Sequence, residues 1–316
     1  MIRRGTVRRY FTIAALSAAA LGLAACGSPG EAAAEEAVQI GYFPLVHTAT
    51  AVNAEENGLF AAEGLEVELV QTQGGAAAIP ALISGNVDLT YANYTSALLA
   101  VQQGLPVRFI SGNDVGAADH GIYVAKDSGI TRVEDLAGKT FAVNNLQNIG
   151  TVAIYSLLED AGLDTAAVDL IEMPYPDMQA ALERGAVDAI WQVEPFQASA
   201  AAAGFVKISN LFTGPVEGMP VAGWITTEKF LQENPEAVEG FRKAIAASAE
   251  ELQDNRARLA ELVPTFTKVS AEVVEQIEMP RFQGQLDGDQ LQKTADLMHK
   301  YMIIDAALDV RPLLAD

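Results

Sequence analysis

The sequence predicts an α/β protein of two lobes, each a mainly parallel sheet flanked by helices. Segments with strand and helix patterns alternate from about residue 38 to about residue 225. An octapeptide occurs twice, as Ala81-Leu-Ile-Ser-Gly-Asn-Val-Asp88 and as Ala181-Leu-Glu-Arg-Gly-Ala-Val-Asp188, at a spacing too long for a solenoid repeat. We interpret it as one unit used once in each lobe. The roughly 280 residues from 38 onward suit two lobes.

The chain begins with an export signal. Four arginines precede an apolar run at 11–25 that is too short to span a membrane, so residues 1–25 are predicted to be a lipoprotein signal peptide. The segment Leu23-Ala-Ala-Cys26-Gly27 resembles the bacterial lipobox, which makes the single cysteine, Cys26, the expected lipidation site. An ordinary signal peptide is the weaker alternative, and Arg8-Arg9 leaves export by either the general or the twin-arginine route open. Residues 26–37 have the composition of a flexible tether.

Charge and residue usage exclude several classes of partner. The chain has 41 acidic and 20 basic residues and a formal net charge of −21, which argues against nucleic acid and against docking on anionic lipid. No run after the signal is apolar enough to cross a membrane. The three histidines have no metal-ligand spacing. We therefore expect no metal, no cofactor and no nucleic-acid partner, and membrane contact through the lipid anchor only.

The first lobe starts with a β-branched and aromatic strand at 38–43, which Pro44 ends. Thr48 is a candidate cap for the helix that follows. The helix carrying the first octapeptide starts at Gly74-Gly75, after a strand at 66–70, and ends at the glycine of the octapeptide. Further strands are predicted at 87–91 and 107–110, with a helix between them.

The second lobe repeats the alternation. Strands are predicted at 121–125, 140–143, 168–171, 187–191 and 205–208. The second octapeptide helix precedes the fourth of these, and a helix from Glu194-Pro195 to Ala203 follows it. The Gly/Pro-rich segment 214–220 is interpreted as the return crossing to the first lobe, before a strand at 221–225. Everything from Thr227 on has a helical pattern.

Lobe 1 is therefore predicted to hold residues 38–113 and 214–316, and lobe 2 residues 114–213. The octapeptide aspartates, Asp88 and Asp188, lie at the starts of their strands, away from the carboxyl ends where open α/β sheets bind ligands. We interpret both as structural, each bonded to a neighbouring backbone N–H.

A set of motifs then resembles those of the extracytoplasmic solute-binding proteins of ATP-driven (ABC) importers, in the branch for nitrate, taurine, alkanesulfonates and thiamine-pyrimidine precursors. The motifs, which together cover residues 38–210, are Gly58-Leu-Phe-x-x-Glu63-Gly64-Leu-x-Val67, Ala81-Leu-x-x-Gly85-x-Val-Asp88, Gly104-x-Pro106-Val107, Asp135-Leu-x-Gly138-Lys139, and Ala181-Leu-x-x-Gly185-x-Val-Asp188 with Glu194-Pro195. The resemblance implies the periplasmic-binding-protein type II fold, with a ligand cleft between lobes that closes like a hinge.

The resemblance also implies a partner and a place. A monomeric binding protein, held by its lipid on the outer face of the cytoplasmic membrane, would deliver a small-molecule ligand to the permease and ATPase subunits of an importer. An enzyme is the alternative, because a thiamine-pyrimidine synthase shares this fold. That synthase has clustered cysteines, whereas this chain has one cysteine, within its export signal. A binding protein is therefore favoured over an enzyme.

Candidate ligand-binding residues follow from the loops after the strands. They are Phe43, His47, Thr48, Gly74, Gly75, Tyr91, Asn93, Tyr94, Thr95, His120, Asn145, Asn148, Trp191, Glu194 and Trp224. Of the aromatic residues, Trp191 and Tyr94 are expected at the ligand, and Tyr42 and Phe196 in the core. Replacing Trp191 by alanine is expected to weaken binding with little loss of stability.

Two ligand classes stay open at this point. Helix starts such as Gly74-Gly75 offer free backbone N–H groups, which favour a sulfonate, carboxylate or nitrate. The same loops contain no lysine or arginine. Their aromatic rings suit a planar heterocycle, and Glu194, Asp119 or Asp114 can accept hydrogen bonds from its amino groups.

Overall fold

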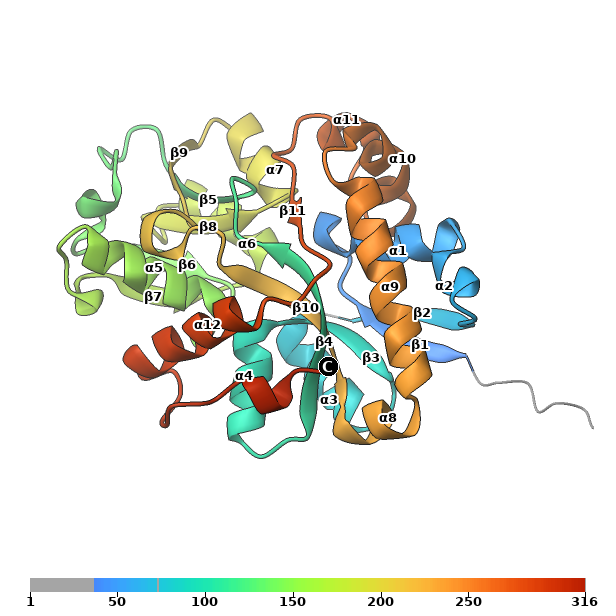
Figure 1. Ribbon diagram of the computed structural model, residues 1–316. Helices are drawn as coiled ribbons and strands as arrows, with labels where there is room; N and C mark the ends of the chain where they lie inside the picture. Colours follow the sequence, from blue (N-terminus) through green and yellow to red (C-terminus); the bar gives the residue numbers. More distant parts are fainter. Residues whose placement is uncertain (1–36, 73, 316) are drawn as a thin grey trace, which may run out of the picture. The chain divides into compact units, whose positions relative to one another are not determined.

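The computed structural model describes residues 37–72 and 74–315, and these contain two β-sheets (Figure 1). The strands of the first sheet are β1 (Val38–Tyr42), β2 (Val67–Gln71), β3 (Leu89–Asn93), β4 (Val107–Val115), β10 (Pro220–Thr227) and β11 (Arg281–Phe282). Their order is β11-β4-β10-β3-β1-β2. The strands of the second sheet are β5 (His120–Val124), β6 (Thr140–Val143), β7 (Asp169–Glu172), β8 (Ala189–Val193) and β9 (Val206–Asn210). Their order is β7-β6-β8-β5-β9.

Strand direction records where the chain passes between the sheets. β1 is parallel to β2 and β3, and β6 is parallel to β7 and β8. β10 is antiparallel to β3 and β4, and β5 is antiparallel to β8 and β9. Both β5 and β10 are the first strands after a crossing. The chain leaves one sheet at the carboxyl ends of its parallel strands and enters the other sheet at the carboxyl ends of that sheet's parallel strands. The first strand after the crossing must therefore run antiparallel to them.

Helices cover both sheets. Those next to the first sheet in sequence are α1 (Ala49–Glu56), α2 (Leu59–Ala62), α3 (Gly75–Ile83), α4 (Tyr94–Gln102), α8 (Glu228–Glu233), α9 (Pro235–Leu252), α10 (Arg256–Phe266), α11 (Ala271–Val274) and α12 (Gly288–Lys300). Those of the second are α5 (Ile149–Asp160), α6 (Tyr175–Glu183) and α7 (Phe196–Ala202). α3, α4 and α9 pack against β3, β10 and β4, while α6 and α7 pack against β8.

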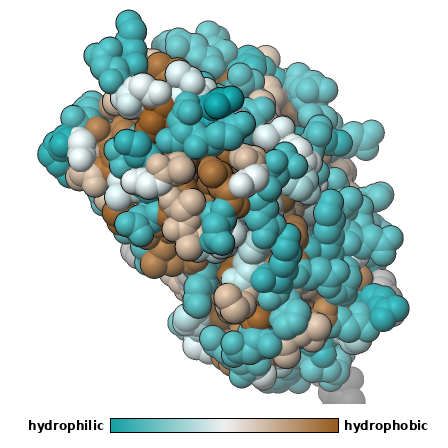
Figure 2. Space-filling model, turned by 90° about the vertical axis from the view of Figure 1, so that its left-hand side faces the viewer, coloured by the Kyte–Doolittle hydropathy of each residue, from teal (hydrophilic) through white to brown (hydrophobic). Residues whose placement is uncertain are grey.

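Short 3₁₀ helices complete the chain. They are η1 (Val46–Thr48), η2 (Val133–Leu136), η3 (Thr165–Ala167), η4 (Gly214–Val216) and η5 (Arg311–Leu313). No helix of the described residues is both long and apolar enough to cross a membrane. On the face drawn in Figure 2, hydrophilic residues prevail and apolar ones form scattered patches between them.

The two octapeptides have the same structure. Each ends a helix, α3 or α6, at a glycine with a left-handed φ of 75° in the first copy and 67° in the second, as a helix C-terminus requires. Asp88 Oδ2 accepts a hydrogen bond from the backbone N–H of Gln39 at 2.9 Å. Asp188 Oδ2 accepts the equivalent bond from Thr140 at 2.9 Å. The structural role predicted for both aspartates is confirmed.

Several predicted boundaries are wrong. β3 and β8 begin two residues later than predicted, because residues 86–88 and 186–188 are still in the turn after each glycine. β4 and β10 are longer than predicted, since each pairs along the other's full length. α7 begins at Phe196 rather than Glu194, and β11 interrupts the region expected to be wholly helical. The predicted signal peptide, Cys26 and nearly all of the tether lie outside the described residues.

Candidate functional site

A small cavity of about 70 Å³ lies between the two sheets. From the first sheet and its loops it is lined by Phe43, Leu45, His47, Gly74, Tyr91, Asn93, Asp114, Val221 and Ala222. From the second it is lined by His120, Asn144, Tyr175, Trp191 and Val193. Phe43 and Asn144 directly follow β1 and β6, and Asn93 and Val193 end β3 and β8. The cavity therefore lies at the carboxyl ends of strands from both sheets, where such folds bind ligands.

About half of the predicted site residues line this cavity. Phe43, His47, Gly74, Tyr91, Asn93, His120 and Trp191 do so. Gly75 follows Gly74 as the first residue of α3. The sequence-based selection missed Tyr175 and Asn144, although both follow strands by the rule used for the others. Asp114 was considered as a hydrogen-bond acceptor but was not selected as a site residue.

Two predicted aromatic residues lie in the core instead. Tyr94 is 1% exposed, packs against Phe109, and donates its hydroxyl to the carbonyl of Ser111 at 3.5 Å. Trp224 is fully buried, and its Nε1–H donates to Asn113 Oδ1 at 3.0 Å. Neither lines the cavity, because Tyr94 begins α4 on its packed side and Trp224 projects from β10 into the core. Of the two rings expected at the ligand, Trp191 lines this cavity and Tyr94 does not.

The remaining predicted polar residues hold the loops around the cavity. Glu194 accepts hydrogen bonds from Gln197 Nε2, from the backbone N–H of Ala198 and from that of Glu278, at 2.9, 3.1 and 3.0 Å. It thereby ties the start of α7 to the chain just before β11. Thr48 donates its hydroxyl to the carbonyl of Phe43 at 2.6 Å, which fixes the loop that carries His47.

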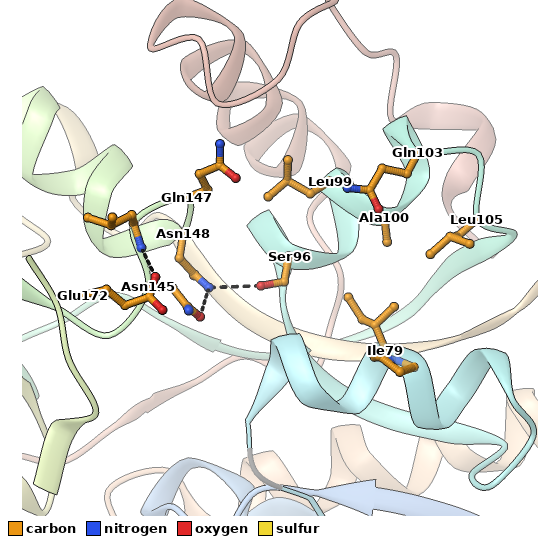
Figure 3. A pocket seen from close by; sticks show the side chains of 12 residues that line it. Ile79, Ser96, Leu99, Ala100, Gln103, Leu105, Asn145, Gln147, Asn148 and Glu172 are labelled. Carbon is orange, nitrogen blue, oxygen red and sulfur yellow. Dashed lines mark hydrogen bonds between the residues drawn. The ribbon is translucent and has the colours of Figure 1, made fainter.

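Thr95, Asn145 and Asn148 belong to a group of hydrogen bonds between the starts of α4 and α5, and Figure 3 shows the part formed by Ser96, Asn145 and Asn148. Thr95 Oγ1 donates to Asn148 Oδ1 at 2.9 Å, and Asn148 Nδ2 donates to Ser96 Oγ at 3.0 Å. Asn148 Nδ2 also lies 3.4 Å from Asn145 Oδ1. These bonds join the start of α4 to the start of α5, beside a larger open groove of about 630 Å³. The three residues therefore join the two halves of the molecule rather than line the small cavity.

Five of the side chains that line the cavity have buried polar atoms without a hydrogen-bond partner among the described residues. These atoms are His47 Nδ1, Asp114 Oδ2, both ring nitrogens of His120, Asn144 Oδ1 and Trp191 Nε1. Buried polar groups are nearly always hydrogen-bonded in folded proteins. Water or a solute that enters the cavity must pair with these atoms, which makes the cavity the candidate ligand site.

The family described as NMT1/THI5 like matches residues 46–257, well over half of the chain. The chain belongs to the NMT1/THI5-like family. The taurine-binding periplasmic protein of Escherichia coli (strain K12) is 25% identical over 193 residues, which are 60% of this chain and 59% of that protein. The formylaminopyrimidine-binding protein of Halalkalibacterium halodurans is 29% identical over 187 residues, 58% of this chain and 56% of that one. The chain thus spans less than two thirds of the length of these two relatives.

The fold of this NMT1/THI5-like protein is also that of solved binding proteins. The alkanesulfonate-binding protein SsuA from Xanthomonas axonopodis pv. citri, bound to MOPS, superposes with a TM-score of 0.75 at 19% identity, covering 89% of this chain and 98% of that one. This likeness establishes the two-sheet binding-protein fold predicted from the sequence. The named relatives are solute-binding proteins rather than enzymes.

Two buried carboxyl groups and two imidazoles determine the electrostatics of the cavity. They belong to Asp114, Asp119, His47 and His120. Burial raises the pKa of Asp114 above its usual value. Burial by itself lowers the pKa of His47, but the nearby Asp114 and Asp119 outweigh it and the pKa is raised. Burial lowers the pKa of His120 to about 4. Although burial opposes it, the imidazoles of His120 and His47 lower the pKa of Asp119.

His47 and His120, which have no metal-ligand spacing in the sequence, meet in the folded protein. The ring centroids of His47 and His120 lie 5.5 Å apart, and His47 Nε2 lies 2.6 Å from Asp119 Oδ2. No lysine or arginine is found among the described residues that line the cavity. The cavity is therefore acidic in character, with aromatic walls.

Proposed function

We propose that this chain is the extracytoplasmic solute-binding component of an ABC importer, and that its solute is a small planar nitrogen heterocycle bearing amino groups. The observation that carries this proposal is the set of unpaired buried polar atoms facing an aromatic-walled cavity between two sheets. Such a site suits capture by closure of one half of the molecule on the other. The proposal is of a binding protein and not of an enzyme, as for the named relatives.

Three features of the cavity favour a heterocycle. The rings of Trp191 and Tyr175, 5.3 Å apart, and that of Tyr91 offer faces and edges to a planar ligand. Asp114 Oδ2 and Asn144 Oδ1 are free to accept hydrogen bonds from amino groups. No lysine or arginine among the described lining residues would balance a sulfonate or nitrate. The name of the formylaminopyrimidine-binding relative agrees with this chemistry.

An aminoalkanesulfonate such as taurine is the second candidate, and one observation favours it. Gly74, which lines the cavity, is the residue before α3, and the N-terminus of a helix attracts anions. The sulfonate group of such a solute would bind at the N-terminus of α3, and its ammonium group would bind Asp114. The name of the taurine-binding relative agrees with this alternative.

We propose further that the mature protein is a monomer anchored through lipid at Cys26 on the outer face of the cytoplasmic membrane. The lipobox-like sequence supports the anchor, and the binding-protein relatives support the compartment. The partners would be the permease and ATPase subunits of the importer, reached by the form closed on its solute. We place the boundaries between lobes at 113/114, near the end of β4, and at 213/214, between β9 and β10.

A binding screen tests the proposal. The purified protein is titrated calorimetrically and in thermal-shift assays with aminopyrimidines, taurine, alkanesulfonates, nitrate and aromatic carboxylates. At a hundredfold its dissociation constant, a true ligand adds about 2.7 kcal/mol to the free energy of unfolding. We expect aminopyrimidines to bind, Asp114→Asn to weaken binding, and the exposed Asp177→Asn to leave it unchanged. Binding only of anions that have no N–H donor would refute the heterocycle assignment.

A further inference from the structure

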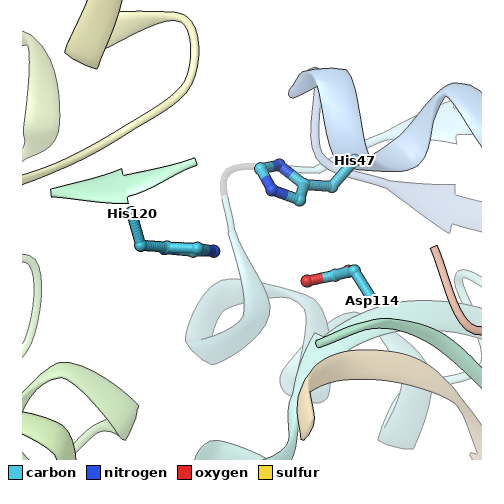
Figure 4. A group of neighbouring side chains, drawn as sticks. All are labelled: His47, Asp114 and His120. Atoms are coloured by element: carbon cyan, nitrogen blue, oxygen red, sulfur yellow. The ribbon is translucent and has the colours of Figure 1, made fainter. Parts of the chain in front are cut away.

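Three side chains converge on one point of the cavity wall (Figure 4). His47 comes from η1, Asp114 from β4 and His120 from the start of β5. They are 1%, 2% and 2% exposed. One ligand-type atom from each lies within 4.8 Å of those from the other two. The group thus brings two imidazoles and one carboxylate from three separate elements into a buried space.

Each of the three side chains has an atom free to bind a ligand. His47 presents Nδ1, because its Nε2 is held by Asp119 at 2.6 Å. Asp114 presents Oδ2, because its Oδ1 accepts from Tyr91 Oη at 2.9 Å and from Asn113 Nδ2 at 2.8 Å. Neither ring nitrogen of His120 has a hydrogen-bond partner among the described residues, and Nε2 lies 3.6 Å from Asp119 Oδ2.

The surrounding contacts are those that orient metal ligands. An imidazole bound to a metal usually gives its other nitrogen to a carboxylate, which fixes the ring and raises its basicity. Asp119, itself fully buried, has this relation to His47. The bonds from Tyr91 and Asn113 orient Asp114 in the same way.

The charge of the site also calls for a cation. The described residues that line the cavity include no lysine or arginine, while Asp114 and Asp119 are both buried beside it. Asp119 is paired with His47, but no ion pair is found for Asp114 among the described residues. Burying an unbalanced carboxylate is costly, and a divalent ion would balance it.

We propose that His47, Asp114 and His120 bind a divalent transition-metal ion of the zinc class, with its remaining coordination positions open to the cavity. Two imidazoles and one carboxylate are a common ligand set for such ions, and three protein ligands leave room for a further one. Metal–ligand bonds of about 2.1 Å allow two ligands to lie at most about 4.2 Å apart. Small side-chain rotations close the difference from the 4.8 Å limit.

The ion would give the solute its anchor, a point that rests on the proposed function. Ring nitrogens of heterocycles and sulfonate oxygens both coordinate such ions, so the open positions suit either candidate solute. With Asp114 Oδ2 on the ion, amino hydrogens of a heterocycle would be accepted by Asn144 Oδ1. A bound cation would also explain how a cavity without basic residues takes a solute with an anionic group.

Titration with the metal alone tests the inference. The full-length protein, without a polyhistidine tag, is stripped with a chelator and titrated with ZnCl₂ by calorimetry and with CoCl₂ by visible absorption. We expect one equivalent to bind, with the absorption bands of cobalt held by nitrogen and oxygen ligands. His120→Ala and Asp114→Asn should abolish this step, and Asp119→Asn should weaken it about 10- to 100-fold.

The matched control is His299→Ala, which removes the remaining histidine of the chain, on α12, and should bind metal like the wild type. Thermal melts of the metal-free variants establish that they fold. If His120→Ala does not fold, His120→Gln is used in its place. The inference is overturned if the wild type takes up no metal, or if His120→Gln and Asp114→Asn bind it as the wild type does. If the protein binds no metal but binds a solute in the presence of chelator, the metal site is refuted and the proposed function stands. If it binds metal but none of the solutes in the screen, the metal site stands and the proposed function is refuted.

Discussion

Replacing Trp191 by alanine separates the contribution of this side chain to the fold from its contribution to the cavity. The indole is 1% exposed and lines the cavity. Its ring centroid lies 5.3 Å from that of Tyr175 and 5.8 Å from that of His120. A Cβ atom on Gly150 would lie 2.3 Å from Trp191 Cζ3, so the helix α5 packs directly on the ring. The variant loses all of these contacts at once.

The size of the effect follows from the burial. Truncating a buried tryptophan or phenylalanine to alanine costs about 3–5 kcal/mol. Burying 150–250 Å² of aromatic surface at about 25 cal/mol per Å² gives a similar 4–6 kcal/mol. At roughly 2 °C per kcal/mol for a chain of this size, the melting temperature should fall by about 6–10 °C. The sequence-based expectation of little loss of stability is therefore replaced.

Melts followed by circular dichroism, together with calorimetric titration of the best solute from the screen, measure both effects. Trp191→Phe keeps a ring and should lie between wild type and Trp191→Ala in both measurements. Met302→Ala, at a residue 84% exposed, should change stability by no more than about 0.5 kcal/mol. A melting temperature for Trp191→Ala within about 1 °C of the wild type would refute the core role of the ring. Unchanged solute affinity would refute its role in the cavity.

Three further predictions concern the scaffold, pH and the anchor. Asp188→Ala leaves the backbone N–H of Thr140 without its acceptor and should cost about 1–3 kcal/mol in urea unfolding without changing solute affinity; lost affinity at unchanged stability would contradict this. Burial raises the pKa of Glu194, so its favourable contribution is complete below the ordinary glutamate pKa and is lost as pH rises through the raised one. As the pH rises above the ordinary pKa of glutamate, the Glu194→Gln variant should accordingly gain stability relative to the wild type. A pH-independent difference in the free energy of unfolding would count against this. Cys26→Ala should move the protein from the membrane to the soluble fraction, and persistence in the membrane fraction would exclude lipid anchoring at this cysteine.

The fold was predictable because its signals are local. Strand and helix patterns, glycine stops and the doubled octapeptide each depend on a few neighbouring residues. The missed extension of β4 to Val115 depends instead on pairing with β10, about 110 residues later in the chain. Asp114 lies in that extension, so its place beside the cavity could not be read from its neighbours. The short β11 was missed for the same reason, since it exists only by pairing with β4.

Side-chain direction limited the prediction of the site. The loops after the strands were correctly located, but which side chains face the cavity depends on helix phase and strand register. Tyr94 begins α4 and turns into the core, while Tyr175 begins α6 and lines the cavity. The rule applied to the other loops also covers the residues after β7, and it would have found Tyr175. The meeting of His47 with His120 depends on tertiary structure alone.

The strand that follows each copy of the octapeptide contributes residues to the cavity wall. In both copies the residues three and five positions after the aspartate line the cavity: Tyr91 and Asn93 in one, Trp191 and Val193 in the other. Residues two apart on a strand point to the same face, so each pair lies together on the side of its strand that meets the cavity. The repeat thus places equivalent strand positions on the two sides of the cavity. The two sides differ in chemistry because different residues occupy these positions, Tyr91 and Asn93 on one side and Trp191 and Val193 on the other.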